Sequence, residues 1–126
     1  PPAGVPGTIG WHELYAADGP SAFGFYEKLF GWKKKDAIDM GDMGLYQMFS
    51  TDGDAPVGGI MTRTPDIPVP YWNYYFNVDG IYAALQRVMD GGGQPIMGPH
   101  QVPTGQWILL ALDPQGAPFA LLSAVR

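Results

Sequence analysis

The chain has 126 residues, the size of one domain, and 46% of them are hydrophobic, enough to bury a core. The formal net charge of −5 disfavours nucleic acids and anionic membranes as partners, because both attract basic surfaces. The sequence has no cysteine, which excludes disulfides and thiolate ligands and fits a reducing compartment. We therefore expect a cytoplasmic protein. No apolar run approaches the roughly 20 residues of a membrane span.

The first half of the chain predicts a strand, a helix and three further strands. Apolar and polar residues alternate over 8–16, which predicts the opening strand. Asp18 or Ser21 can cap a helix whose apolar residues recur at intervals of three and four, and Gly31 ends it. Turns rich in Gly and Asp then separate three short strands, which we expect over 33–40, 44–50 and 55–62.

A connector with three prolines, residues 64–70, leads into a second half with the same order of elements. Three glycines at 91–93 end the helix of this half. The strand that follows contains Pro95 and Pro99, so it must be an edge or irregular strand. The expected ranges are 71–78 for the first strand, 81–90 for the helix, and 94–102, 106–112 and 119–124 for the last three strands.

Short motifs of the first half also return in the same order, sixty-one positions later. The matched pairs are Trp11 with Trp72, Asp18 with Asp79, and Asp52 with Asp113. This internal repeat predicts two copies of one βαβββ unit. We expect a first repeat over about 7–63 and a second over about 71–125, within a single domain of residues 1–126. The predicted fold class is α+β, with the two units forming a curved mixed sheet around a cup.

Four stretches carry a resemblance to a known family: WHELYAAD and FYEKLFGW in the first half, NYYFNVDGIYAAL and LLALDPQGAPFALL in the second. Together they resemble the vicinal oxygen chelate superfamily, which includes glyoxalase I, extradiol dioxygenases and bleomycin resistance proteins. The resemblance covers nearly the whole chain from Gly7, and this chain is similar to one half of a two-domain glyoxalase-like protein. The resemblance implies a homodimer, or pairing with a second glyoxalase-like domain.

In metal-dependent members the resemblance implies four ligands, two on the first strands of the repeats and two on their last strands. Carried over to this chain, the four positions are His12, Gly59, Asn73 and Ala120. Gly59 and Ala120 have no side-chain donor, and asparagine is a weak ligand, whereas catalytic metal sites use about three protein ligands. We therefore expect no metal and no other cofactor, a bound divalent metal being the alternative.

The cup is then expected to hold a small, partly apolar molecule, because Gly59 and Ala120 leave room where ligands would stand. Met61, Tyr75 and Trp107 could instead fill this space as core. The predicted ligand-binding residues are His12, Leu14, Gln47, Gly59, Met61, Asn73, Tyr75, Trp107, Ala120 and Leu122.

Strand alternation predicts which side chains of the first strand face the cup. His12 and Leu14 should face it, and Glu13 should lie on the helix side or at a rim. Trp11 and Trp72 should pack under the helices.

Three functions stay open. The first is a metal-free, glyoxalase-like binding protein in which His12 and Asn73 hydrogen-bond to a small molecule. The second is a lyase or isomerase of the glyoxalase type, or a dioxygenase, with His12 as general base or metal anchor. The third is a degenerate domain that only pairs with another such domain. Metal content separates the first two, and a ligand-dependent rise in melting temperature separates the first from the third.

Overall fold

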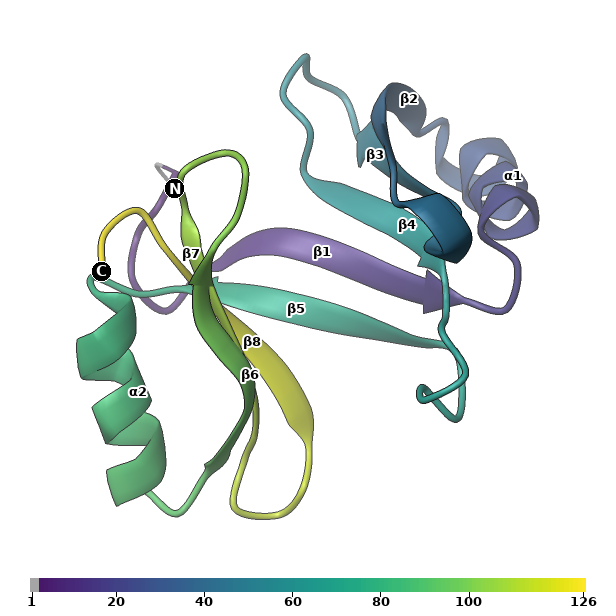
Figure 1. Cartoon of the computed structure of the whole chain (residues 1–126). Helices are drawn as coiled ribbons and strands as arrows, with labels where there is room; N and C mark the ends of the chain where they lie inside the picture. The colour runs from purple at the N-terminus through teal and green to yellow at the C-terminus, as the bar shows by residue number, and fades with distance from the viewer. Residues whose placement is uncertain (1–2) are drawn as a thin grey trace. The chain divides into compact units, whose positions relative to one another are not determined.

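A computed structural model of the chain describes residues 3–126, and these contain two α-helices, eight strands and one short 3-10 helix (Figure 1). The first half contains β1 (Ile9–Ala16), α1 (Gly19–Phe30), β2 (Lys33–Asp39), the 3-10 helix (Gly41–Met43), β3 (Leu45–Ser50) and β4 (Gly58–Thr62). The second half contains β5 (Tyr71–Asn77), α2 (Ile81–Asp90), β6 (Gln94–Gln101), β7 (Trp107–Leu112) and β8 (Pro118–Ser123). The predicted α+β class and the order strand, helix and three strands, occurring twice, are confirmed. Over the described residues, neither helix is long and apolar enough to cross a membrane.

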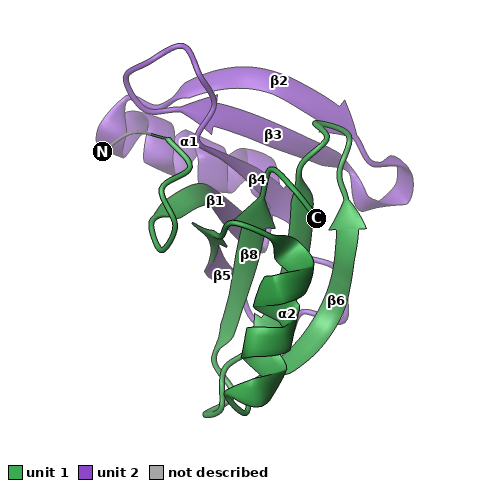
Figure 2. Ribbon diagram, turned by 90° about the vertical axis from the view of Figure 1, so that its left-hand side faces the viewer, with its two compact units in different colours: residues 1–11, 74–126 green, residues 12–73 purple. Residues whose placement is uncertain are grey.

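The chain packs as two compact units, which Figure 2 shows in green and purple. Unit 1 comprises the chain up to Trp11 together with Tyr74–Arg126, and unit 2 comprises His12–Asn73. These boundaries differ from the predicted repeats because β1 and β5 each contribute residues to both units.

Hydrogen bonds and packing at the two strands explain this division. In unit 1, the backbone NH of Asn77 donates to the carbonyl oxygen of Thr8 at 2.8 Å, so the segment before β1 belongs with the end of β5. In unit 2, Trp72 at the start of β5 donates from Nε1 to the hydroxyl of Tyr26 on α1 at 3.2 Å. The start of each strand is therefore held by the other repeat.

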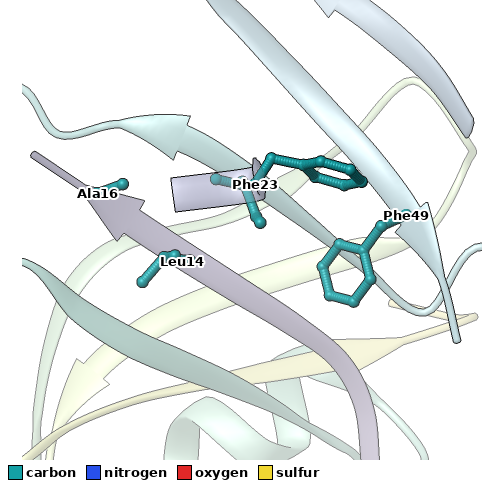
Figure 3. Close-up of a cluster of buried hydrophobic side chains, with 5 residues drawn as sticks. Leu14, Ala16, Phe23 and Phe49 are labelled. Carbon is teal, nitrogen blue, oxygen red and sulfur yellow. The ribbon is translucent and has the colours of Figure 1, made fainter. Parts of the chain in front are cut away.

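In unit 2, β1 pairs in parallel with β4, and β3 pairs antiparallel with both β4 and β2. Helix α1 begins where Asp18 accepts a hydrogen bond from the backbone NH of Ser21 at 3.3 Å, as predicted, and ends at Gly31, whose φ of 74° suits glycine. The buried Phe23 of α1 packs with Leu14 of β1 and Phe49 of β3 (Figure 3). This core lies on the α1 side of the unit 2 strands.

In unit 1, β5 pairs in parallel with β8, and β7 pairs antiparallel with both β8 and β6. Helix α2 buries Ile81 and Ala84 against Leu109 and Leu121 of the strands. Strand β6 ends the strand order, and its pairing with β7 is irregular between Pro95 and His100. The prediction of an edge strand is therefore confirmed, because proline cannot donate a ladder hydrogen bond.

Candidate functional site

The side chains of β1 point to the faces opposite to those predicted. Leu14 is buried on the α1 side with Phe23, whereas Glu13 lies on the other face, beside Tyr15. The expectation that His12 and Leu14 face away from the helix is therefore wrong, and Glu13, which was expected on the helix side or at a rim, does not lie on the helix side. A shift of one residue moves every side chain of a strand to the opposite face.

The two matched tryptophans also lie in different surroundings. Trp72 packs with Tyr26 beneath α1, as predicted. Trp11 instead packs in unit 1 with Tyr75, Ala120 and Leu122, so its predicted place under a helix is wrong. The sixty-one-residue offset therefore aligns the letters of the first strands, but not the faces of their side chains.

Strand pairing gives a different set of equivalent positions from the offset. Glu13 lies opposite Gly59 in the β1–β4 pair, and Tyr75 lies opposite Ala120 in the β5–β8 pair. Paired residues share a face of the sheet, whereas His12 pairs with Gly58, the neighbour of Gly59. The residue that accompanies Gly59 is therefore Glu13, and not His12.

The face of unit 2 opposite to α1 carries a polar group of side chains, which we call the Glu13 cluster and which consists of Glu13, Tyr15, Tyr46 and Asn73. The Glu13 side chain is only 7% exposed. Its Oε2 accepts a hydrogen bond from the Tyr15 hydroxyl at 2.6 Å, and its Oε1 accepts one from the Tyr46 hydroxyl at 2.7 Å. Two phenols thus satisfy a buried carboxylate, which would be costly to bury without partners.

Gly59 makes room for one of these phenols. A Cβ atom at Gly59 would lie 2.2 Å from Cε1 of Tyr46, far inside van der Waals contact. Glycine at this position therefore lets the Tyr46 ring lie across β4 and reach Glu13. The predicted small residue is present, but the space beside it is used by Tyr46.

Burial and the Glu13 charge both raise the pKa of Tyr15 and of Tyr71. Burial, followed by the charge of Glu13 and the hydrogen bond to it, raises the pKa of the Tyr15 hydroxyl. Burial and the charge of Glu13 also raise the pKa of Tyr71, whose ring centroid lies 5.2 Å from that of Tyr15. Both hydroxyls therefore remain donors at neutral pH.

Asn73 supplies a buried polar atom that has no hydrogen-bond partner among the described residues. Its side chain is 2% exposed and lies beside the Tyr15 hydroxyl, whose pKa it lowers. Because the single hydroxyl hydrogen of Tyr15 points to Glu13, the Tyr15 oxygen must accept, so the NH2 group of Asn73 faces it. The Oδ1 atom of Asn73 is buried and accepts no hydrogen bond from the described residues. Such an atom costs about 1–3 kcal/mol unless a donor reaches it.

The other predicted residues of unit 2 divide between the two faces. Met61 pairs with Tyr15 and lies on the face of the Glu13 cluster. His12 lies on the α1 side, with Nδ1 3.0 Å from the carbonyl oxygen of Val57. Gln47 pairs with the core residue Ile60, and its Nε2 donates to two backbone carbonyls at 2.7 and 2.9 Å. The structure thus brings Gly59, Met61 and Asn73 together, and leaves His12, Leu14 and Gln47 on the other face.

In unit 1, three of the predicted residues form one buried apolar cluster: Tyr75, Ala120 and Leu122. Trp107 does not join them, because it packs on the α2 side, where its ring lies 6.2 Å from that of Tyr82. Trp107 therefore packs against the core beneath α2, and it neither lines the cup as a ligand contact nor fills it.

Unit 2 also has a pocket of about 420 Å³ on the α1 side of β1. Leu14, Ala16 and Phe25 are among its apolar walls. Asp18 and Ser21 lie at its rim, but they bond to each other as the cap of α1. This pocket offers an apolar surface and few uncommitted polar groups.

The donors of unit 2 do not fit the divalent metal that the resemblance implies. Glu13 is held by two phenols, and Gly59 opposite to it has no donor. Across residues 3–126, no group of three or more His, Asp or Glu side chains is placed to hold a metal ion. A catalytic divalent ion commonly needs about three protein ligands. We therefore derive no chemical step through a metal.

Sequence reasoning missed the residues at the centre of this face. The alternation in Glu13-Leu14-Tyr15 places Glu13 and Tyr15 on one face of the strand and Leu14 on the other. A polar pair opposite an apolar leucine could have indicated that the leucine faces the helix and the polar pair does not. The contact with Tyr46 joins residues 33 positions apart, and no local pattern predicts it.

Comparisons with known proteins agree with the resemblance. The family model for the Glyoxalase/Bleomycin resistance protein/Dioxygenase superfamily matches residues 8–121. CFP32 of Mycobacterium tuberculosis, provisionally named a glyoxylase, is 35% identical over 123 residues, covering 95% of this chain and 47% of that protein. The anthracycline biosynthesis protein DnrV of Streptomyces peucetius is 33% identical over 131 residues, covering 93% of this chain and 47% of that protein. The chain thus spans about half the length of these relatives.

Solved structures show the same fold at low sequence identity. One is a variant of Streptomyces coelicolor methylmalonyl-CoA epimerase in complex with 2-nitronate-propionyl-CoA. It has a TM-score of 0.70 and 15% identity, and the likeness covers 95% of this chain and 99% of that one.

Proposed function

Because the chain belongs to the Glyoxalase/Bleomycin resistance protein/Dioxygenase superfamily, we propose that it binds a small, partly apolar molecule against the Glu13 cluster, without a divalent metal. The observation that carries this proposal is the buried Oδ1 of Asn73, which accepts no hydrogen bond from the described residues. A ligand donor at this atom would remove the cost of an unsatisfied buried acceptor.

The surroundings of Asn73 support the same proposal. Tyr15, Met61 and Tyr71 add aromatic and apolar surface on this face, and Gly59 adds no side chain. Small-molecule sites combine such surface with a few fixed polar groups. The hydrogen bonds among Glu13, Tyr15 and Asn73 fix those groups before a ligand arrives, which lowers the entropy lost on binding.

A second candidate is an isomerase or lyase of the glyoxalase type, in which Glu13 exchanges a proton with the substrate. The observation that favours it is a buried carboxylate with two fixed phenol donors, in a fold shared with solved methylmalonyl-CoA epimerases. Glu13 then takes the role expected of His12, whose ring lies on the α1 side. Replacement of Glu13 by glutamine would abolish turnover by this route and leave a pure binding function open to measurement.

We further propose that the chain is cytoplasmic and acts as a homodimer or beside a second glyoxalase-like domain, with neither nucleic acid nor membrane as partner. Its match to about half of CFP32 and DnrV supports the pairing. A domain that only pairs, with no ligand of its own, is the third candidate.

Two measurements on the same preparation test the proposal. Plasma mass spectrometry after incubation with zinc, nickel, manganese and iron(II), then desalting, should find well under one equivalent of each metal. Thermal unfolding in a library of small aromatic compounds should reveal some that raise the melting temperature, because binding to the folded state stabilises it by mass action.

The variant Asn73→Leu should lose those shifts, while Gln115→Ala, in an exposed turn of unit 1, should keep them. One equivalent of bound metal would contradict the metal-free function. Shifts that persist in Asn73→Leu would place the ligand elsewhere, and a library without any shift would favour the pairing domain.

A further inference from the structure

The geometry points to a particular ligand class for the Glu13 cluster: a neutral or cationic hydrogen-bond donor on an aromatic or apolar body, such as a phenol or a primary amine, and not an anion. This inference rests on the proposed function of the same site and adds the chemistry that the site selects.

Glu13 places a negative charge on this face, beside the hydroxyls of Tyr15 and Tyr46. Burial is the larger cause of the raised pKa of Tyr15 and Tyr71, and the charge of Glu13 adds to it at both hydroxyls, with Asp66 also acting on Tyr71. Asn73 and Glu13 both act on the Tyr15 hydroxyl, so Asn73 lies near this charge. A carboxylate or phosphate placed at Asn73 would therefore meet like charge in a poorly solvated place, whereas a cation would be attracted.

The buried polar atom of the Glu13 cluster that has no hydrogen-bond partner among the described residues is an acceptor, Oδ1 of Asn73. The hydroxyl hydrogens of Tyr15 and Tyr46 both point to Glu13. The NH2 group of Asn73 faces Tyr15, and its Oδ1 is the buried atom without a partner. An oxyanion cannot satisfy Oδ1 of Asn73, because that atom is itself an acceptor, while an N–H or O–H group can.

The aromatic rings on this face also favour ligands that carry a cation or present the electron-poor edge of a flat ring. The rings of Tyr15 and Tyr71 lie 5.2 Å apart and are tilted by 52°. Tyr71 is partly exposed, so one ring of the pair is within reach from solvent. Ammonium groups are attracted to aromatic faces, and this attraction adds to that of Glu13.

Arg63 is the basic residue that follows β4, and its positive charge does not cancel the effect of Glu13 on the two tyrosines. Its Nη1 donates to the carbonyl oxygen of Ile67 at 2.7 Å, within the connector. It is not among the charges that shift the pKa of Tyr15 or Tyr71, although it carries the opposite sign to Glu13. Nη1 thus binds the connector, while Nε of the same side chain is buried and has no hydrogen-bond partner among the described residues.

Four probes of similar size separate the possibilities by calorimetric titration at pH 7: p-cresol, benzylamine, toluene and benzoate. They present a neutral donor, a cationic donor, no polar group and an anion. We expect p-cresol and benzylamine to bind about tenfold or more tightly than toluene, because each satisfies Oδ1 of Asn73, and benzoate to bind most weakly. Equal or tighter binding of benzoate than of benzylamine would overturn the inference.

Variants assign the preference to Glu13. In Glu13→Gln the affinity ratio of benzylamine to benzoate should fall by about tenfold or more, because the charge is lost and the size is kept. Asp54→Asn makes the same charge change at an exposed position of unit 2 and should keep the ratio. An unchanged ratio in Glu13→Gln would contradict the role of Glu13.

Further outcomes of these titrations also test the inferred ligand class. Benzoate binding that Arg63→Gln abolishes would show an anion site and overturn the inference. If Glu13→Gln does not fold, the four probes on the unaltered protein still decide. Absence of binding by all four probes, toluene included, would count against the proposed function itself, whereas binding without the expected order would count only against the ligand class.

Discussion

The substitution Gly59→Ala should destabilise the protein through Tyr46, and its cost can be worked from the structure. The new Cβ would lie 2.2 Å from Cε1 and 2.5 Å from the hydroxyl oxygen of Tyr46. Ordinary contact between such atoms is about 3.5 Å, so the ring must move by roughly 1 Å or more. The hydroxyl of Tyr46 lies 2.7 Å from Oε1 of Glu13, and this movement would break the hydrogen bond.

A hydrogen bond to a charged group contributes about 1.5–3 kcal/mol. Replacing a strand glycine by alanine returns about 0.5–1 kcal/mol, because the unfolded chain loses freedom. The free energy of unfolding should therefore fall by about 0.5–2.5 kcal/mol in Gly59→Ala. Gly58→Ala should cost more, because its Cβ would lie 2.2 Å from the backbone oxygen of His12, which cannot swing away as a side chain can.

Urea unfolding followed by circular dichroism measures these costs. Gly53→Ala is the matched control, since a Cβ there meets nothing within 4 Å, and its effect should stay within about 0.5 kcal/mol. In a Tyr46→Phe background, Gly59→Ala should cost less, because no hydrogen bond to Glu13 is left to break. The reasoning would be refuted if Gly59→Ala were neutral, or if it cost the same in both backgrounds.

Three further predictions concern the tyrosine pair and the two cores. Folding raises the pKa of Tyr15, mainly by burial and then through Glu13, so the folded state keeps a proton that the unfolded chain loses near pH 10. The free energy of unfolding should therefore fall above that pH by about 1.4 kcal/mol per pH unit. Urea titrations from pH 8 to 11 should show a flatter slope for Tyr15→Phe. Gly24→Ala, inside α1 with open space around its Cα, should raise the free energy of unfolding by about 0.5–1 kcal/mol, and an unchanged or lower urea midpoint would contradict the helix geometry. Phe23→Ala and Leu109→Ala, each in the buried core of a different unit, should cost about 3–5 and 2–5 kcal/mol respectively, and a loss below about 1 kcal/mol would argue against the burial of that side chain.

Local chemistry made most of the fold predictable. The cap at Asp18, the stop at Gly31 and the irregular edge strand around Pro95 all depend on residues close in sequence, and the structure confirms each. Strand ends agree to within about three residues, since turn signals mark them less sharply than caps mark helices. The division of β1 and β5 between two compact units depends on packing over long sequence separations, which a pattern of residues does not show.

The faces of β1 were harder to predict for a specific reason. Trp11 and Trp72 match in sequence, but Trp72 packs beneath α1 and Trp11 packs with Tyr75. A repeat aligned on these letters is therefore one residue out in its side-chain faces, so Leu14 and Glu13 exchange places. Strand pairing shows which side chains share a face, and the offset does not. It places Glu13 opposite Gly59 and Tyr75 opposite Ala120.

The central claim, a small-molecule site at the Glu13 cluster, is tested most directly by NMR. Nitrogen-15 spectra of the labelled protein would be recorded during a titration with p-cresol, following the side-chain NH2 of Asn73 and the backbone amides of Glu13 and Tyr15. The account predicts saturable shifts at all three residues. Shifts that map instead to Leu14 and Phe25, in the pocket beside α1, or no saturable shift at all, would contradict it.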